Sequence, residues 1–369
     1  MRILLIFGTR PEAIKMCPLV AELRGRDWAQ PQVCVTGQHR QMLDGALAAF
    51  GVVPDFDLGI MRAGQTPAQV TSRILSAIQP VLDEARPQLV LVHGDTTTAL
   101  AAAMACFYRR IPVGHVEAGL RTYDMNAPFP EEMNRRVISL MAKYHFAPTT
   151  SAEQNLIREG IAGDSIFVTG NTVIDALKTT VRKDYSHPIL SWACGSRLVL
   201  ITAHRREMLG KPMRTVFRSI RRVIEERREL KAVFPIHLNP EVRRLAAEEL
   251  SGCERIRIIE PLGVIDFHNF LARSDLVITD SGGIQEEAPF LGVPVLVTRN
   301  CTERQEGVDA GALRLIGTTE SSIYQGLSEV LDSRVEYEKM ARAESPYGDG
   351  SAAERIANII YSVSASGFE

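Results

Sequence analysis

Short apolar runs alternate with helix-length segments along the chain. In the first half, five runs have the length and continuous apolar character of buried strands: Ile3–Phe7, Val33–Thr36, Leu89–Val92, Val113–Val116 and Ile166–Val168. Helix-length segments separate them, among them Thr66–Arg86 and Thr96–Arg110. Because strands that are apolar on both faces must be covered on both faces, this alternation predicts a parallel sheet between two layers of helices.

The pattern weakens over residues 178–197 and then restarts. Five further strands are predicted at Leu198–Thr202, Val233–Ile236, Ile256–Ile259, Leu276–Thr279 and Val295–Val297. Helices are predicted at Pro212–Glu229, Pro240–Leu250, Ser281–Leu291 and, near the end of the chain, from Ser351 to about Ser362. The sequence therefore predicts an α/β protein of two Rossmann-like domains, over residues 1–172 and 173–350. Two such sheets facing each other leave a cleft at the carboxyl ends of their strands, where ligands bind.

The composition narrows the classes of function. A length of 369 residues suits two domains, and 45% hydrophobic with 23% charged residues is ordinary for a globular protein. Lys plus Arg number 42 against 44 for Asp plus Glu, which argues against a nucleic-acid partner. The one dense arginine run, from Arg218 to Arg228, is interpreted as a solvated helix face.

The cysteines and apolar segments indicate the compartment. No apolar run approaches the roughly 18 residues of a membrane span, and Met1–Phe7 is too short for the apolar core of a signal peptide. The 6 cysteines form no CxxC pair and have no histidine at zinc-site spacing, so free thiols in a reducing compartment are expected. We expect a cytoplasmic protein with no membrane partner.

Charged residues gather directly after the predicted strands of the first half. The segment Gly8–Lys15 places Arg10 and Lys15 at the start of a helix. There they could hold an anion, or lie exposed on an ordinary strand–helix turn. The segment contains neither the GxGxxG nor the Walker pattern, so no dinucleotide or P-loop site is predicted.

Carboxylates follow the later strands of the same half: Asp95, Glu117, Glu131 and Glu132. Taken singly, several have an ordinary explanation, because Asp95 could cap the next helix and the adjacent glutamates suit a helix N-terminus. Like charges gathered at one edge of a sheet are costly unless they act on a substrate. The group as a whole therefore favours a functional site.

The second half offers a cradle for phosphate. Ser281, Gly282 and Gly283 follow an apolar strand and open a helix, so the backbone can approach an anion closely. The alternative is an ordinary capped helix start. Glu287, in the first turns of this helix, could accept two ribose hydroxyls.

Further polar residues also follow strands of the second half. His204 could donate to a phosphate oxygen, and Arg205 and Arg304 add positive charge. His237 ends another strand, where a structural and a functional role are both open. One domain thus offers carboxylates and the other offers phosphate and ribose contacts, which suits a nucleotide-sugar.

Together these segments resemble the non-hydrolysing bacterial UDP-N-acetylglucosamine 2-epimerases. The matching stretches follow the order of that family and span most of the chain: GTRPEAIKM from Gly8, VHGDTTT from Val92, GHVEAGLRT from Gly114, PEEMNRR from Pro130, APT from Ala147, VTGNTVIDAL from Val168, AHRRE from Ala203, HLNP from His237 and TDSGGIQEEAP from Thr279. No single stretch identifies the family, whereas the combination is specific.

The resemblance implies the GT-B fold, with a C-terminal helix at 351–369 that packs back on the first domain. It implies reversible conversion of UDP-N-acetylglucosamine to UDP-N-acetylmannosamine by a homodimer, for cell-surface polysaccharide synthesis, with no cofactor and no metal. The implied chemistry is elimination and re-addition. A base takes the proton from sugar carbon 2 while UDP leaves carbon 1, and UDP adds back to the 2-acetamidoglucal after protonation on the other face.

The resemblance also implies residue roles. The acid/base set is Asp95, Glu117 and Glu131, assisted at the diphosphate by His204, and which carboxylate serves which face stays open. The positions matching UDP contacts are Arg10, Lys15, Ser281, Gly282, Gly283, Glu287, Arg304 and, at the uracil, Phe267. A second, regulatory site for the substrate matches Gln38, Gln41, Glu132, Arg205 and His237. The hypothesis follows that the substrate activates its own conversion by favouring closure.

The chain departs from the family pattern outside the acid/base set. The departures concern regulation and substrate recognition, and they fall at Gly64, Met208, Val264, Cys301 and Gln305. Three alternatives share part of the pattern. A GT-B glycosyltransferase needs one base and an acceptor groove, and a nucleotide-sugar sensor needs no acids, so the carboxylate set speaks against both. A hydrolysing epimerase, which releases UDP and free N-acetylmannosamine, is separated by product analysis.

Overall fold

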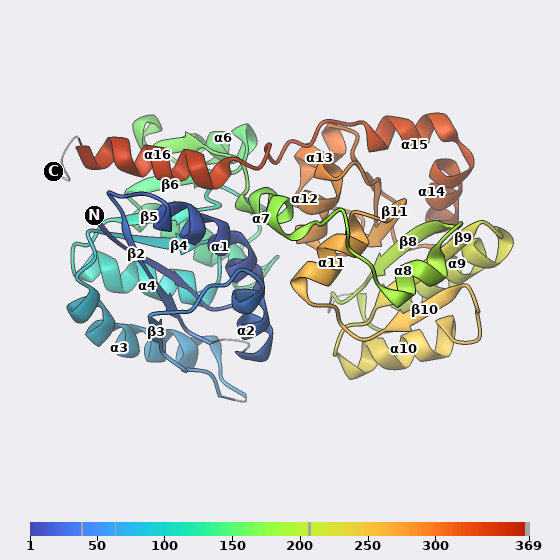
Figure 1. The fold of residues 1–369 in the computed structure, drawn as a ribbon, viewed down its shortest axis with the longest axis horizontal. Coiled ribbons are helices and arrows are strands. Elements are labelled where there is room, and N and C mark those ends of the chain that lie inside the picture. The colour runs from blue at the N-terminus through green and yellow to red at the C-terminus, as the bar shows by residue number, and fades with distance from the viewer. Residues whose placement is uncertain (38–39, 63, 206–207, 366–369) are drawn as a thin grey trace. The chain divides into compact units, whose positions relative to one another are not determined.

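Two parallel sheets organise the part of the chain that the structure, a computed structural model, describes: residues 1–37, 40–62, 64–205 and 208–365 (Figure 1). They belong to two compact units, one made of residues 1–178 and 347–369 and the other of residues 179–346. Neighbouring strands are parallel in both sheets. The prediction of an α/β protein with two parallel sheets is confirmed.

The first sheet has the strand order β3-β2-β1-β4-β5-β6-β7. Its strands are β1 (Arg2–Phe7), β2 (Gln30–Val35), β3 (Phe56–Asp57), β4 (Leu89–His93), β5 (Val113–Val116), β6 (Tyr144–Ala147) and β7 (Ile166–Val168). The strands predicted for this half are all present, with ends shifted by a few residues. The sequence analysis missed β3, which is very short, and β6, where Tyr144 and His145 interrupt the apolar pattern. His145 is nevertheless buried. Its Nε2 lies 2.9 Å from the carbonyl oxygen of Ser139, so the buried nitrogen has a hydrogen-bond partner.

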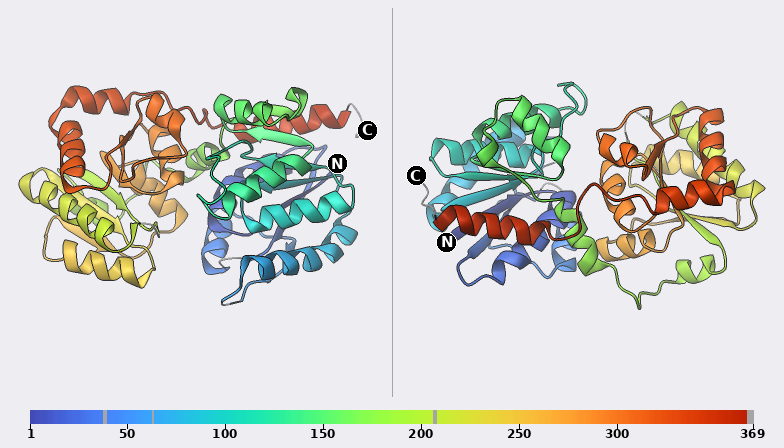
Figure 2. Two further views of the ribbon diagram at one scale, coloured as in Figure 1. Left: turned by 180° about the vertical axis from the view of Figure 1, so that it is seen from behind. Right: turned by 90° about the horizontal axis from the view of Figure 1, so that it is seen from above.

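Helices cover the first sheet in two layers (Figures 1 and 2). They are α1 (Arg10–Arg24), α2 (Arg40–Ala49), α3 (Pro67–Ala85), α4 (Thr97–Tyr108), α5 (Glu131–Met141), α6 (Thr150–Arg158), α7 (Thr172–Thr180) and α16 (Ala352–Ala365). α1 packs against α2 and α16, whereas α4 packs between α3 and α5. Threonine caps fix where several begin: Thr9 and Thr66 form capping boxes, each followed by a proline in the first turn.

The second sheet has the strand order β10-β9-β8-β11-β12-β13. Its strands are β8 (Arg197–Thr202), β9 (Leu230–Pro235), β10 (Ile256–Ile259), β11 (Leu276–Thr279), β12 (Val295–Val297) and β13 (Leu313–Leu315). Its helices are α8 (Pro188–Ala193), α9 (Lys211–Glu226), α10 (Pro240–Leu250), α11 (Val264–Leu271), α12 (Gly282–Phe290), α13 (Gln305–Asp309), α14 (Glu320–Asp332) and α15 (Arg334–Ala341). The predicted strands are again present, while β13 and the helices α8, α11, α13, α14 and α15 were not predicted.

The strand orders explain why chemistry gathers at particular loops. In the first sheet, the order reverses between β1 and β4, and in the second sheet it reverses between β8 and β11. At such a switch point, the chain leaves neighbouring strands toward opposite faces and opens a crevice at their carboxyl ends. The loops that start at Gly8 and Gly94 flank this point in the first sheet. Those that start at Ala203 and Asp280 flank it in the second.

The last helix, α16, is part of the first unit (Figure 1). It packs against α1, and the rings of Trp28 and Tyr361 lie 5.4 Å apart between centroids. Asp175 in α7 accepts the backbone N–H groups of Ala352 and Ala353 at 3.2 and 2.9 Å, so a side chain of the first unit caps the start of α16.

The arginines on one face of α9 form ion pairs with glutamates. Arg221 and Arg222 pair with glutamates one turn later on the same helix, at 2.8 and 2.9 Å, and Arg218 pairs with Glu249 of α10 at 2.7 Å. All the cysteines are free thiols, as expected. No helix within the described ranges has both the length and the apolar character needed to cross a membrane.

Candidate active site

Glu12 joins two of the loops at the switch point of the first sheet. Its Oε2 accepts the backbone N–H groups of Gly8 and Thr9 at 3.0 and 2.8 Å, and its Oε1 accepts the Thr96 hydroxyl at 2.7 Å. Burial raises the pKa of this carboxyl, although the hydrogen bonds oppose that effect. The loops after β1 and β4 are therefore held together by one side chain.

Gly8 lies where no side chain fits. A Cβ built at this position would lie 2.0 Å from Thr36 Oγ1 and 2.7 Å from Thr98 Oγ1. These two hydroxyls are themselves hydrogen-bonded at 2.9 Å, so they are fixed. The glycine of the GTRPEAIKM stretch is thus required by packing between the loops after β1, β2 and β4.

Glu117 is the first residue after β5 and has a left-handed backbone conformation with φ +62°. This region is costly for a residue other than glycine, and such residues cluster at functional sites. Its side chain is only 9% exposed and forms an ion pair with Lys15. Asn171 donates to its Oε2 at 2.8 Å, and His93 Nε2 lies 3.8 Å from the same oxygen. Glu117 is therefore held by Lys15 and Asn171, and His93 lies beside it.

His93 is a buried, neutral neighbour of Glu117. Burial lowers the pKa of His93 to about 4, although the negative charge of Glu117 acts in the opposite direction. No described residue forms a hydrogen bond with its Nε2. Neither His93 nor Asn171 was among the predicted site residues, because the sequence gives no sign of which strand-end side chains will face Glu117.

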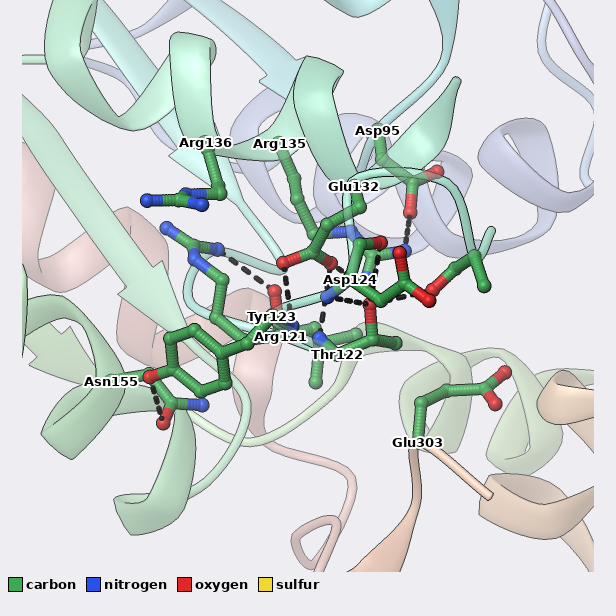
Figure 3. A network of polar contacts seen from close by, with 12 residues as sticks. Asp95, Arg121, Thr122, Tyr123, Asp124, Glu132, Arg135, Arg136, Asn155 and Glu303 are labelled. Carbon is green, nitrogen blue, oxygen red and sulfur yellow. Dashed lines mark hydrogen bonds and ion pairs between the residues drawn. The ribbon is translucent and has the colours of Figure 1, made fainter. Parts of the chain in front are cut away.

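Asp95 follows β4 and is supported by α5 (Figure 3). Its carboxylate forms an ion pair with Arg135, and its backbone oxygen accepts from Asn134 Nδ2 at 2.8 Å. The Asp95 side chain keeps 27% of its surface exposed, whereas Arg135 is buried. The PEEMNRR stretch thus contributes the side chains that fix the loop after β4.

The two adjacent glutamates of α5 lie in different surroundings, and Figure 3 shows those of Glu132. Glu132 is fully buried and accepts the backbone N–H groups of Thr122 and Tyr123 at 3.0 and 3.1 Å. Glu131 is half-buried, and its carboxylate has no hydrogen bond or ion pair with another described residue. Glu132 therefore stabilises the loop after β5, and Glu131 keeps a carboxylate available for a ligand.

In the second sheet, Asp280 connects the loops after β11 and β8. Its Oδ1 lies 2.9 Å from His204 Nδ1, and its Oδ2 accepts the backbone N–H groups of His204 and Arg205 at 2.8 and 3.0 Å. Burial alone raises the pKa of this carboxyl, but the hydrogen bonds and the charge of His204 bring it below its usual value. Asp280 was not predicted as a site residue.

The residues predicted to form a phosphate cradle lie at the start of α12. Ser281 is the N-cap residue, and its backbone N–H donates to Thr279 Oγ1 at 2.9 Å. A Cβ at Gly282 would lie 3.1 Å from the Arg304 guanidinium carbon, so this glycine lets the cation approach the helix start. A Cβ at Gly283 would make only an ordinary contact, 3.6 Å from Glu287 Oε1. Helix N-terminus and guanidinium together favour an anion.

Three arginines surround Glu303 beside this cradle. Arg205, Arg299 and Arg304 lie 3.1, 2.9 and 2.9 Å from its carboxylate oxygens. Burial works against ionisation of Glu303, but the arginines hold its pKa well below the usual range. Arg304 also pairs with Glu286 at 2.8 Å. The predicted cation Arg304 is thus fixed by two carboxylates, neither of which was predicted.

The remaining predicted residues lie as follows. Arg10 is the first residue of α1, and Glu287 is nearly buried in α12, with His268 Nε2 3.8 Å from its Oε2. Phe267 of α11 packs against the apolar cluster of β11 and β12. His237 follows β9, and its ring centroid lies 5.5 Å from that of His204. Gln38 lies outside the described residues, and Gln41 lies in α2.

Of the departures from the family pattern, Gly64 lies in the first unit and the other four lie in the second. Met208 is buried in the core of the second unit, and Gly64 has φ +73°, a conformation that favours glycine. Val264 and Gln305 begin α11 and α13, and Cys301 is exposed.

Known proteins match the whole arrangement. The model of the family described as UDP-N-acetylglucosamine 2-epimerase matches residues 21–361. A UDP-N-acetylglucosamine 2-epimerase of Bacillus subtilis is 54% identical over 356 residues, which cover 96% of this chain and 94% of that protein.

Solved structures extend the match to the fold. The UDP-GlcNAc 2-epimerase of Neisseria meningitidis bound to UDP-GlcNAc has a TM-score of 0.92 at 43% identity and covers 98% of this chain and 100% of that one. An S. aureus protein solved with UDP has a TM-score of 0.93 at 49% identity, covering 99% and 97%. The predicted GT-B fold is confirmed.

Proposed function

The chain belongs to the UDP-N-acetylglucosamine 2-epimerase family, and from this premise we propose that it interconverts UDP-N-acetylglucosamine and UDP-N-acetylmannosamine without net hydrolysis. The observation that carries the proposal is Glu117, a carboxylate fixed by Lys15 and Asn171 in a left-handed backbone conformation. Such a group is arranged to accept or return a proton rather than to stabilise the fold.

The reaction begins with loss of the proton on sugar carbon 2. The electron pair of that carbon–hydrogen bond forms the double bond of 2-acetamidoglucal, while the bond from carbon 1 to the diphosphate oxygen breaks and its electrons leave with UDP. Asp95, Glu117 and Glu131 form the acid/base set. The ammonium of Lys15 pairs with the carboxylate of Glu117. Positioned groups of this kind typically contribute about 10²–10⁴-fold to the rate.

Re-addition reverses the electron flow. Carbon 2 takes a proton on the opposite face, and the diphosphate oxygen bonds to carbon 1. Negative charge develops on the departing diphosphate in the first step, and donors arranged beforehand stabilise that charge. The N-terminus of α12, with Ser281, Gly282, Gly283 and Arg304, supports this role, together with His204, Arg10 and Lys15. Glu287 accepts the ribose hydroxyls, and Phe267 contacts the uracil.

Product analysis tests the proposal. Purified protein is incubated with UDP-N-acetylglucosamine alone, and the products are followed by proton NMR, with a Glu131→Gln variant as a comparison. We expect UDP-N-acetylmannosamine to accumulate to an equilibrium, more slowly in the variant. Accumulation of UDP and free N-acetylmannosamine would identify a hydrolysing epimerase instead, and turnover only with a sugar acceptor would identify a glycosyltransferase.

Regulation by the substrate is the second part of the proposal. Arg205 donates to the backbone oxygen of Asp280 at 3.1 Å, and the ring of His237 lies beside that of His204. A ligand bound to Arg205 or to His237 would therefore act on the residues around His204. Gln38, Gln41 and Glu132 complete the proposed regulatory set in a homodimer. We expect conversion of UDP-N-acetylmannosamine alone to show a lag that a trace of UDP-N-acetylglucosamine removes. Progress curves that are linear without added UDP-N-acetylglucosamine would refute this regulation. Analytical sedimentation tests whether the protein is a homodimer.

A further inference from the structure

Asp280 is the buried carboxylate that contacts His204 on both its ring and its backbone. The residue is 1% exposed, with Oδ1 toward the imidazole Nδ1 at 2.9 Å and Oδ2 toward the N–H groups of His204 and Arg205. The His204 side chain, by contrast, keeps 40% of its surface exposed. One edge of the imidazole is thus fixed inside the protein, and the rest of the ring is open to a ligand.

This contact determines which nitrogen of His204 carries a proton. An ionised carboxylate has acceptors only, so Nδ1 must be the donor in the contact with Oδ1. The neutral ring then has a lone pair at Nε2, and a second proton makes Nε2 a donor as well. The ring of His237 is tilted by 31° relative to that of His204, and it limits how the His204 imidazole can turn.

We propose that Asp280 is a positioning residue for His204, fixing Nδ1–H inside the protein so that Nε2 faces the diphosphate oxygen that leaves carbon 1. The inference rests on the proposed function and adds a residue to it. Ser281, the next residue along the chain, caps the helix that cradles the same diphosphate. The short segment Asp280–Ser281 therefore fixes both the ring of His204 and the backbone N–H groups at the start of α12.

The substitution Asp280→Asn separates this role from a structural one. The amide has nearly the shape of the carboxylate, and its oxygen can still accept the backbone N–H groups of the loop after β8. Its NH₂ group then faces His204 Nδ1, which can pair with it only as an acceptor, so the neutral ring should switch to the Nε2–H tautomer. Protein labelled with ¹⁵N-histidine reports the tautomer by NMR, and a His204→Asn spectrum identifies the signal.

The matched control is Asp275→Asn. Asp275 precedes the same strand, β11, and its Oδ2 accepts the backbone N–H of Leu198 at 2.7 Å, so it ties β11 to β8 at the opposite end. We expect Asp275→Asn to leave the His204 tautomer and the turnover unchanged. UDP is the probe for the nitrogen that faces the ligand: in the wild type it should shift the Nε2 resonance more than the Nδ1 resonance.

Kinetics supply the second readout. We expect Asp280→Asn to lower kcat by about 10²-fold, within the range of positioned acid/base groups, with KM changed much less. In a His204→Asn background the same substitution should cost little more, because the two residues act as one unit. An unchanged tautomer in Asp280→Asn, or losses that multiply in the double variant, would overturn the inference. Failure of the wild type to form UDP-N-acetylmannosamine would instead refute the proposed function, while the tautomer and UDP measurements would still decide the role of Asp280.

Discussion

The two units present their polar side chains in opposite ways. In the first unit the important side chains are almost completely buried: those of Glu117, Lys15, His93 and Glu12. Lys15 holds the carboxylate of Glu117, and Thr96 holds that of Glu12. In the second, the start of α12 relies on backbone N–H groups and on arginines paired with Glu303 and Glu286. A proton-transfer group must be fixed to within a hydrogen-bond length, whereas a diphosphate is held by many donors at once. Substitutions of the proton-transfer groups in the first unit should therefore lower kcat, and substitutions in the cradle should mainly raise KM.

The largest effect is expected from Glu117→Gln. The amide keeps the shape of the side chain but cannot take a proton, so kcat should fall by about 10³-fold or more. The affinity for UDP, measured by calorimetry, should change little because the cradle is untouched. Glu84→Gln, an exposed change in α3, is the matched control. Retention of a tenth of the wild-type kcat would remove Glu117 from the acid/base set.

Arg304→Ala tests the other half of the comparison. The change removes a cation and leaves Glu303 and Glu286 without one of their partners, so the cradle becomes less favourable for a diphosphate. Steady-state kinetics should show KM raised by about 10-fold or more, equivalent to roughly 1.4 kcal/mol of binding, with a smaller loss in kcat. Arg304→Lys should recover part of the affinity. A loss confined to kcat would contradict the division between the carboxylates of the first unit and the cradle at the start of α12.

Gly8→Ala should destabilise the first unit without touching a charged group. The added methyl meets two fixed threonine hydroxyls at 2.0 and 2.7 Å, and such overpacking costs typically 1–3 kcal/mol. We expect a lower urea midpoint. Gly45→Ala, in α2, is the matched control because its Cβ meets nothing within 4 Å, so it should leave the midpoint unchanged or raise it. Equal behaviour of the two variants would mean that the loops can separate at little cost.

His93 predicts a pH dependence of stability. Its pKa is about 4 in the folded protein against an ordinary value of 6.5, so below pH 6.5 the unfolded chain binds a proton that the folded one does not. Stability contributed by this group is complete above that pH and is lost as the pH falls toward 4, by about 2 kcal/mol at pH 5. Urea unfolding at pH 8 and pH 5 should show a smaller decrease for His93→Gln than for the wild type. An identical decrease would contradict a buried neutral imidazole.

Much of the fold could be predicted from the sequence because apolar runs and helix caps are local signals. The strands β3 and β6 could not, since one is only two residues long and the other contains Tyr144 and His145. Asp95 and Glu117 could be placed at one edge of the first sheet, and His204 at an edge of the second, because polar residues directly after the strands of a parallel sheet share one edge of that sheet.

The partners of those residues could not be predicted, because they depend on contacts between distant parts of the chain. Asn171 is 54 residues from Glu117, and Asp280 is 76 residues from His204. Likewise, the different surroundings of Glu131 and Glu132 depend on where the loop after β5 runs, which two adjacent identical residues do not reveal.

The most direct test is to run the reaction in heavy water and measure deuterium at sugar carbon 2. Wild-type protein and UDP-N-acetylglucosamine are incubated in deuterium oxide, and the UDP-N-acetylmannosamine formed is examined by proton NMR and mass spectrometry. Proton transfer by the carboxylates of the first unit predicts one deuterium at carbon 2 of the product and none in Glu117→Gln, which should not turn over. Product that keeps its original hydrogen at carbon 2 would contradict proton abstraction at that carbon.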